Sequence, residues 1–283
     1  MIGVTGSTGG VGSGVVRHLL AAGRDDLAAL ARRPEAIPPA PGLEARRADY
    51  DDPASLKAAM RDLDVLVMVS SDGRAETMER HHRNVIAAAD AAGVGRIVYT
   101  SILDVAPGSG FYYAPGHQAT EALLAGRPHC LARTSVFADF FTDSWLGAAL
   151  TTGELVLPLG QAGMSLVARE DVSRALAAAV LDGLEGVLEL TGPENATGDR
   201  IAALASEATG MPLTYRPIGD ADYRPRLQAA GEPDWLIEAY ASMFASVRAG
   251  RFASAPGDVE RLTGTPPVRF DAFLRTRLAD GGS

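Results

Sequence analysis

The sequence predicts an α/β protein built on a doubly wound parallel sheet, with a smaller, mostly helical C-terminal lobe. Three observations lead to this fold class. An apolar run beginning at Ile2 is followed by a glycine-rich turn and then by an apolar helical pattern. Strand-like apolar runs and helical patterns then alternate as far as Arg133. From Thr197 onward the pattern is mostly helical, which indicates the second lobe.

The glycine-rich turn has the spacing Gly6-x-x-Gly9-x-x-Gly12. A strand, a glycine turn and a helix start together point backbone N–H groups and the positive end of the helix dipole at an anion. Glycine permits the tight turn, the close approach of a phosphate and the close packing of helix on strand. An ordinary turn between strand and helix is the alternative. With both flanking elements present, we expect a Rossmann-type pyrophosphate site formed by Gly6, Ser7, Thr8, Gly9, Gly10, Val11 and Gly12.

Periodicity and capping residues predict the other elements of the first half. Strands are expected at residues 27–31, 43–48, 65–69, 97–101 and 129–133, and helices from Asp52-Pro53, over 75–92 and around 118–124. Ligands of such sheets bind at the carboxyl ends of the strands. Residues at these ends include Arg32, Ser70, Ser71, Ser101 and Thr134.

The second half of the sequence is less regular. Short strands are expected at 155–157 and 165–167, a helix over 169–180, a strand at 187–191, and helices over 234–249 and 271–278. The expected division is a dinucleotide-binding domain over residues 1–153 and a smaller substrate-binding lobe over 154–283. The lobe is interleaved with the first domain and is not expected to be independent of it.

Composition narrows the expected partners. A net charge of −9 does not favour nucleic acid. No apolar run reaches the roughly 18 residues of a membrane span, and the single cysteine, Cys130, excludes an internal disulfide. We therefore expect a cytoplasmic protein that acts on a small molecule, with no membrane partner and a homodimer possible. His81 and His82 are adjacent and cannot chelate from one helix face, so no metal site is expected.

The end of the second strand bears on the choice of dinucleotide. An acidic residue there would bond the ribose 2′-hydroxyl of NAD, whereas arginine accommodates the 2′-phosphate of NADP. Arg32 and Arg33 stand at this end, while Asp25 and Asp26 precede the strand. Solvated loop arginines are the alternative. The pattern favours NADP(H) over NAD(H), with Arg32 as the phosphate contact.

Several segments, taken in order, resemble the NmrA-like group of atypical short-chain dehydrogenases, in its NAD(P)H:quinone oxidoreductase and triphenylmethane reductase branch. The resemblance spans nearly the whole chain, although the loop over residues 104–115 matches poorly. The segments are 5–12, Arg32, 48–50, 82–86, 91–94, 99–101, His117-x-x-Thr120-Glu121, 137–141, 169–172 and 191–194.

The resemblance implies roles for individual residues. Besides the glycine turn and Arg32, the cofactor would contact Asp49, Tyr50, Val69, Ser70, Ser71, Thr100, Ser101, His117 and Thr134. The Asp49 position would lie near the adenine, and the positions of Ser70, Ser71 and His117 would line the ribose and nicotinamide. Phe137, Phe140 and Phe141 would face the substrate, with plain core packing as the alternative.

The usual tyrosine–lysine pair of short-chain dehydrogenases cannot operate here. Lys57 is the only lysine, and Pro53 stands four residues before it. Tyr113 has His117 at that spacing. A histidine with an unperturbed pKa near 6.5 donates a proton at neutral pH. The expected catalytic residues are therefore His117, Ser101 and Tyr113, with His117 as the proton donor and Tyr113 dispensable; a helix-start residue holding a carbonyl is the alternative for His117.

The sequence thus predicts an NADPH-dependent oxidoreductase that transfers a hydride to a quinone-like or other conjugated small molecule. Such an acceptor needs little acid–base assistance, so the protein mainly supplies binding and orientation. The alternative is a non-catalytic regulator that binds NADP and acts through a protein partner, because that class also lacks the tyrosine–lysine pair.

Overall fold

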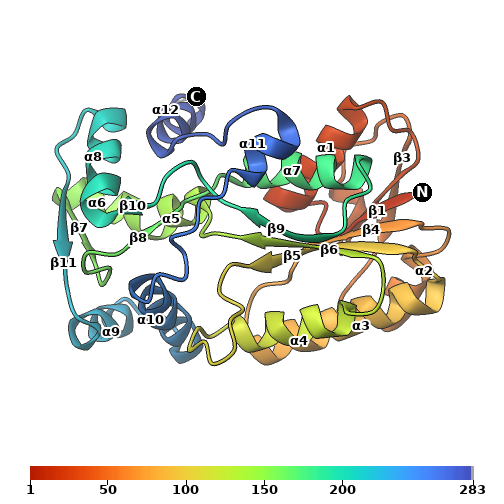
Figure 1. The fold of residues 1–283 in the computed structure, drawn as a ribbon, viewed down its shortest axis with the longest axis horizontal. Coiled ribbons are helices and arrows are strands. Elements are labelled where there is room, and N and C mark those ends of the chain that lie inside the picture. The colour runs from red at the N-terminus through yellow and green to blue at the C-terminus, as the bar shows by residue number, and fades with distance from the viewer. Residues whose placement is uncertain (282–283) are drawn as a thin grey trace. The chain divides into compact units, whose positions relative to one another are not determined.

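The structure is a computed structural model that describes residues 1–281. The chain forms two compact units from alternating segments. Unit 1 comprises Met1–Ile102, Gly116–Arg133 and Arg169–Leu188, and unit 2 comprises Leu103–Pro115, Thr134–Ala168 and the chain from Glu189 onward. The elements of both units are labelled in Figure 1.

Unit 1 is organised around a seven-stranded sheet with the order β3-β2-β1-β4-β5-β6-β9. Its ladders from β3 through β5 are parallel. The strand order reverses between β1 and β4, which is where ligands of doubly wound sheets bind. The predicted fold class is confirmed. The strands are β1 Ile2–Val4, β2 Leu27–Ala31, β3 Leu43–Arg47, β4 Val65–Met68, β5 Arg96–Ile102, β6 His129–Thr134 and β9 Gly186–Leu190.

Helices cover both faces of this sheet (Figure 1). One face carries α1 Gly10–Ala21 and α7 Arg169–Leu181, and the other carries α2 Pro53–Ala59, α3 Ala75–Ala92 and α4 Ala114–Leu124. A short helix, η1, spans Pro34–Ala36. The core between the sheet and α2, α3 and α4 is made of fully buried side chains such as Leu56, Leu66, Ile97 and Tyr99. This packing holds the carboxyl ends of β1, β2, β4 and β5 in fixed register.

Unit 2 is mostly helical and contains two small sheets. Strands β8 and β10 pair antiparallel, and β7 and β11 pair parallel. Its core includes Trp145, which packs on Phe141 and Phe244 and donates its indole N–H to the hydroxyl of Tyr223 at 3.1 Å. The elements are α5 Ala138–Phe141, η2 Thr142–Leu146, α6 Gly147–Thr152, β7 Glu154–Leu157, β8 Gly163–Met164, β10 Ala196–Thr197, α8 Gly198–Thr209, β11 Thr214–Pro217, α9 Asp220–Ala229, α10 Asp234–Arg248, α11 Asp258–Thr263 and α12 Phe270–Gly281.

Two expected elements differ in the structure. The strand expected at 165–167 is wrong: β8 ends at Met164, and Val167 makes only an isolated bridge with Phe137. The backbone N–H of Ser165 instead donates to the carbonyl of Phe252. The helix expected from residue 118 begins earlier, at Ala114. Residues 134–153, placed in the first domain by the sequence-based division, belong to unit 2, while Arg169–Leu188 belong to unit 1.

The described residues contain neither a membrane-spanning helix nor a cluster of metal-ligating side chains. Within residues 1–281, no helix combines the length and the apolar character needed to cross a lipid bilayer. The same part of the chain holds no group of three or more histidine, cysteine, aspartate or glutamate side chains arranged to hold a metal ion.

Candidate cofactor and active site

The glycine-rich turn follows β1 and leads directly into α1. Gly6 has a positive φ of 62°, which favours glycine, and its carbonyl accepts a hydrogen bond from the N–H of Gly9 at 2.8 Å. The Ser7 hydroxyl donates to the carbonyl of Val4 at 2.7 Å. The side chain of Ser7 therefore holds the turn together and is not directed to a ligand.

The third glycine of the motif is required by packing. A β-carbon on Gly12 would lie 2.3 Å from the carbonyl oxygen of Gly6 and 2.7 Å from that of Thr5. Such contacts are far shorter than van der Waals distance, so a side chain would push α1 away from the turn. A β-carbon on Gly9 would lie 3.3 Å from the Gly6 oxygen, its only neighbour within 4 Å. A side chain at Gly9 would therefore require the Gly6 carbonyl to shift by only a few tenths of an ångström, far less than a side chain at Gly12 would require.

The first turn of α1 offers unpaired donors. The N-cap residue, Gly9, has no side chain to cap the helix. Within the described residues, the N–H groups of Gly10, Val11 and Gly12 have no hydrogen-bond partner, whereas that of Ser13 donates to Gly9 at 3.0 Å. Three free N–H groups at the positive end of a twelve-residue helix suit a phosphate group. The residues present here fit a dinucleotide pyrophosphate.

The end of β2 is basic, as expected. Arg32 and Arg33 follow β2 directly and are exposed, and neither guanidinium has an ion-pair or hydrogen-bond partner among residues 1–281. The nearby carboxylates lie elsewhere: Asp26 accepts two hydrogen bonds from Arg24 at the opposite end of the strand. This end of the sheet is therefore free to receive an anionic group.

Tyr50 belongs to a buried link between the ends of β1 and β4. Its hydroxyl lies 2.5 Å from Oγ1 of Thr5 and 2.8 Å from the carbonyl of Val69, and the N–H of Val69 donates to Thr5 Oγ1 at 2.9 Å. Burial raises the pKa of the Tyr50 phenol. Next to this link, the N–H of Ser70 donates to Oγ1 of Thr100 at 2.7 Å. These contacts fix the loop after β4. This loop contains Val69, Ser70 and Ser71, which the sequence analysis expects to contact the cofactor.

Two histidines and a tyrosine form a buried network beside this loop. His82 on α3, His117 on α4 and Tyr99 on β5 are almost completely buried. The Tyr99 hydroxyl lies 2.7 Å from Nδ1 of His117 and 3.3 Å from Nδ1 of His82. The N–H of Ser71 donates to Nε2 of His82 at 3.2 Å. The network therefore links the loop after β4 to His117.

The donors around His82 determine where its proton lies. Because the Ser71 N–H can only donate, Nε2 of His82 accepts and its proton is on Nδ1. That Nδ1–H donates to Oγ1 of Thr120 at 2.9 Å, since the Thr120 hydroxyl donates to the carbonyl of Gly116 at 2.7 Å. The Tyr99 hydroxyl lies within hydrogen-bond distance of Nδ1 of His117, and the tautomer in which Tyr99 donates leaves the His117 proton on Nε2.

Both histidines are neutral at ordinary pH. Burial, with a smaller contribution from His82, lowers the pKa of His117 from 6.5 to about 3. Burial, with a smaller contribution from His81, lowers the pKa of His82 to about 3. The expectation that His117 has an unperturbed pKa is therefore wrong. Its site is too poorly solvated to hold a positive charge.

Ser101 lies inside β5 and not beyond its end. Its hydroxyl donates to Oε1 of Glu121 at 2.7 Å, and Arg133 makes two hydrogen bonds to the same carboxylate. Asp49, between β3 and α2, accepts from the N–H of Asp51 at 3.1 Å. In this structure Ser101 and Asp49 both hold local structure, and their contact with a cofactor stays a prediction.

The other expected residues belong to unit 2. Thr134 is buried, and Tyr113 packs against Phe111 and Tyr112. Phe137 and Phe140 are half-buried, but Phe141 is fully buried against Trp145 and Phe270. Its position favours core packing, the alternative that the sequence left open. Phe137 and Phe140 stay predicted substrate contacts.

Sequence reasoning did not select His82 and Tyr99 as site residues. A signal for His82 was present, because it shares the buried face of α3 with Met78, Val85 and Ile86. A histidine on an apolar face needs a buried polar partner. Tyr99 carried no comparable signal, since a tyrosine in a central strand is ordinary core.

The fold and the glycine turn together define a dinucleotide-binding protein. The chain matches the family model described as NAD(P)H-binding over residues 6–183. It is 32% identical over 274 residues to quinone oxidoreductase 2 of Escherichia coli (strain K12), with 94% of each chain covered.

Solved structures agree with this relationship. The NADPH-dependent quinone oxidoreductase of Escherichia coli, complexed with NADPH, has a TM-score of 0.91 at 29% identity and covers 98% of this chain and 100% of its own. The Citrobacter sp. triphenylmethane reductase complexed with NADP(H) has a TM-score of 0.87 at 27% identity and covers 98% and 99%. The chain belongs to the NAD(P)H-binding family, in its NmrA-like branch of reductases. The predicted class, an NAD(P)H-dependent reductase, is confirmed.

Proposed function

We propose that this protein is an NADPH-dependent reductase of quinone-like or other conjugated small molecules. The observation that carries the proposal is the set of free N–H groups at the start of α1, beside the basic end of β2. Its relatives include a quinone oxidoreductase and a triphenylmethane reductase, which supports an extended conjugated acceptor. When bound, NADPH supplies the hydride that such an acceptor takes up.

The basic end of β2 supports a preference for NADPH over NADH. The 2′-phosphate is the group that distinguishes the two dinucleotides, and in this fold it lies at the end of the second strand. Arg32 and Arg33 are exposed there without an ion-pair partner among the described residues. A guanidinium can donate two hydrogen bonds to a phosphate. The ribose 2′-hydroxyl of NADH carries no charge, so it would form no ion pair with either guanidinium.

The role proposed for His117 is that of a neutral hydrogen-bond donor. The family resemblance supports a position of His117 beside the nicotinamide. In the tautomer in which Tyr99 donates to Nδ1 of His117, the imidazole proton is on Nε2. A neutral imidazole N–H orients and polarises a carbonyl oxygen but is a weak acid, so solvent supplies the proton that accompanies the hydride. Quinones, which are readily reduced, suit such a site.

NADPH consumption against a panel of quinones tests the proposal, with NADH as the alternative donor. We expect turnover with NADPH and weaker binding of NADH. Replacement of Arg32 by Ala should weaken NADPH binding by about 1.5–3 kcal/mol, the range for a charged hydrogen bond, and leave NADH binding nearly unchanged. Tighter binding of NADH by the parent would refute the preference. Tight NADPH binding without turnover of any acceptor would favour the alternative function, a non-catalytic regulator that binds NADP and acts through a protein partner.

A further inference from the structure

Two adjacent histidines of α3 hold Ser71 in the loop after β4. Nε2 of His82 accepts from the backbone N–H of Ser71 at 3.2 Å, and Nδ1 of His81 lies 3.1 Å from the Ser71 hydroxyl oxygen. Because a hydroxyl both donates and accepts, the contact with His81 can form in every protonation state of the ring. The backbone and the side chain of Ser71 are therefore held by different histidines, and the side chain depends on His81.

The second nitrogen of His81 contacts the loop after β3. Nε2 lies 3.1 Å from Oδ2 of Asp51, and Oδ1 of Asp51 accepts from Arg80 at 2.8 Å. Contacts with Arg80 and His81 lower the pKa of the Asp51 carboxyl, so it is ionised at neutral pH. The ring also packs against Tyr50, with 5.7 Å between the ring centroids. His81 thus joins two loops whose strands, β3 and β4, are separated in the sheet by β1 and β2.

The two contacts of His81 differ in how easily they could be replaced. The Asp51 carboxylate keeps Arg80 as a partner without His81. Within residues 1–281, by contrast, the Ser71 hydroxyl makes a hydrogen bond only with His81. The His81 side chain is 14% exposed, so an apolar side chain of similar size would fill its space while making neither contact. Loss of the imidazole would therefore free the Ser71 hydroxyl above all.

We propose that His81 is a positioning residue that fixes the Ser71 hydroxyl for the ribose of the dinucleotide. The inference rests on the proposed cofactor, because the family resemblance implies that the Ser71 position lines the ribose and nicotinamide. His81 acts here through Ser71 and not by touching the cofactor. A hydroxyl that is already held in one orientation loses less conformational freedom when a ligand binds, so the imidazole contributes affinity by preorganisation.

Calorimetric titration of the full chain with two nucleotides tests this role. NADP⁺ carries the whole dinucleotide, whereas adenosine 2′,5′-bisphosphate lacks the nicotinamide and its ribose. His81→Leu should weaken NADP⁺ binding about threefold to tenfold, the range for one side chain that must be ordered on binding, and leave the bisphosphate unchanged. His81→Gln, whose amide offers both a donor and an acceptor, should recover part of the NADP⁺ affinity.

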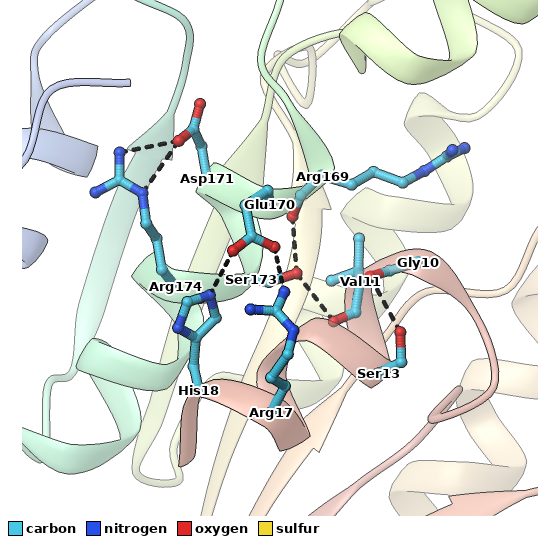
Figure 2. Close-up of polar contacts among 10 residues, drawn as sticks. All are labelled: Gly10, Val11, Ser13, Arg17, His18, Arg169, Glu170, Asp171, Ser173 and Arg174. Carbon is cyan, nitrogen blue, oxygen red and sulfur yellow. Dashed lines mark hydrogen bonds and ion pairs between the residues drawn. The ribbon is translucent and has the colours of Figure 1, made fainter. Parts of the chain in front are cut away.

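Figure 2 shows the matched control, a histidine that contacts a carboxylate away from the loops. Nε2 of His18, in the last turn of α1, lies 2.9 Å from Oε1 of Glu170 on α7, and Arg17 contacts the same carboxylate. This pair joins two helices and has the same partners, a histidine and an arginine on one carboxylate, as Asp51. His18→Leu should therefore bind both nucleotides like the parent.

Two further variants separate the contacts of His81. Arg80→Gln removes the other partner of Asp51 and should bind both nucleotides like the parent. Ser71→Ala should weaken NADP⁺ binding as much as His81→Leu does, and the double variant should lose no more than either single variant, because both changes remove one interaction. Unfolding midpoints without nucleotide detect a damaged fold, and Ser71→Ala and His81→Gln remain informative if His81→Leu unfolds early.

Three results would overturn the role of His81. These are parental NADP⁺ affinity in both His81→Leu and Ser71→Ala, additive losses in the double variant, and an equal loss in Arg80→Gln, which would assign the effect to Asp51. In each of these cases the parent still binds NADP⁺, so the proposed cofactor stands. A parent that does not bind NADP⁺ would overturn the proposed cofactor and, with it, this role.

Discussion

The buried histidines make stability depend on pH well above the range in which carboxylates titrate. His82 and His117 each have a pKa near 3 in the folded protein against 6.5 for the free side chain. Their folded pKa lies below the unfolded one, so the unfolded chain binds more protons between these values. Stability contributed by neutral histidines is therefore complete above pH 6.5 and is lost as the pH falls toward 3.

The magnitude follows from this difference in pKa. Between pH 7 and pH 5 each histidine removes about 2 kcal/mol from the free energy of unfolding, and the pair removes at most about 4. A typical domain has only about 5–15 kcal/mol in total. Carboxylates with lowered pKa, such as Asp51 and Asp52, lose their contribution mainly below pH 4.5. The window from pH 7 to 5 thus isolates the histidines.

Urea unfolding at half-unit steps from pH 8 to 5 measures this effect. His82→Gln and His117→Gln should each reduce the slope of the free energy of unfolding against pH by about half, whatever they do to stability at pH 8. This slope is proportional to the difference in bound protons between the unfolded and the folded state. His129→Gln at the start of β6, which lies outside the network, should keep the parental slope. A parental free energy that stays level from pH 7 to 5 would refute the neutral, buried assignment of both histidines.

Two further outcomes follow from the site. Gly9→Ala should fold normally and weaken NADPH binding, whereas Gly12→Ala should lower the free energy of unfolding by about 1–3 kcal/mol because its β-carbon would overlap the Gly6 carbonyl. Circular dichroism melts with NADPH titration distinguish them, and equal melts would contradict the packing argument. His117→Ala should lower kcat by about tenfold to a hundredfold, at or below the low end for help from a positioned acid or hydrogen-bond donor, and Tyr99→Phe should lower it less. Steady-state kinetics with a saturating quinone measure both effects. A kcat equal to that of the parent in both variants would show that His117 takes no part in the reaction.

Elements whose signals are local were predictable from sequence. The strand at Leu27–Ala31 and the helix over Ala75–Ala92 have the predicted bounds. The strand is a continuous apolar run, and the helix ends at Ala92 and is capped by Gly93, whose φ is a positive 72°. The glycine turn was predictable for the same reason, since its spacing, strand and helix lie within some twenty residues.

Features that depend on distant partners were not predictable. Residues 165–167 alternate like a strand, yet the N–H of Ser165 bonds to Phe252, which no local pattern reveals. The lowered pKa of His117 likewise depends on the burial that α3 and β5 provide. Arg169 lies beside Gly10 only because Ser173 and Glu170 dock α7 on α1. Contacts between residues far apart in the sequence determine each of these features, and local sequence patterns do not reveal such contacts.

The residues that violate local rules in unit 1 share one physical explanation. Three N–H groups at the start of α1 lack partners among the described residues, and His82 occupies an apolar helix face. Each arrangement costs stability in the protein alone. A pyrophosphate would satisfy the N–H groups, and the His82 network extends from the Ser71 loop of the same sheet. Such costs persist where function requires them, so the dinucleotide accounts for local features that folding by itself does not explain.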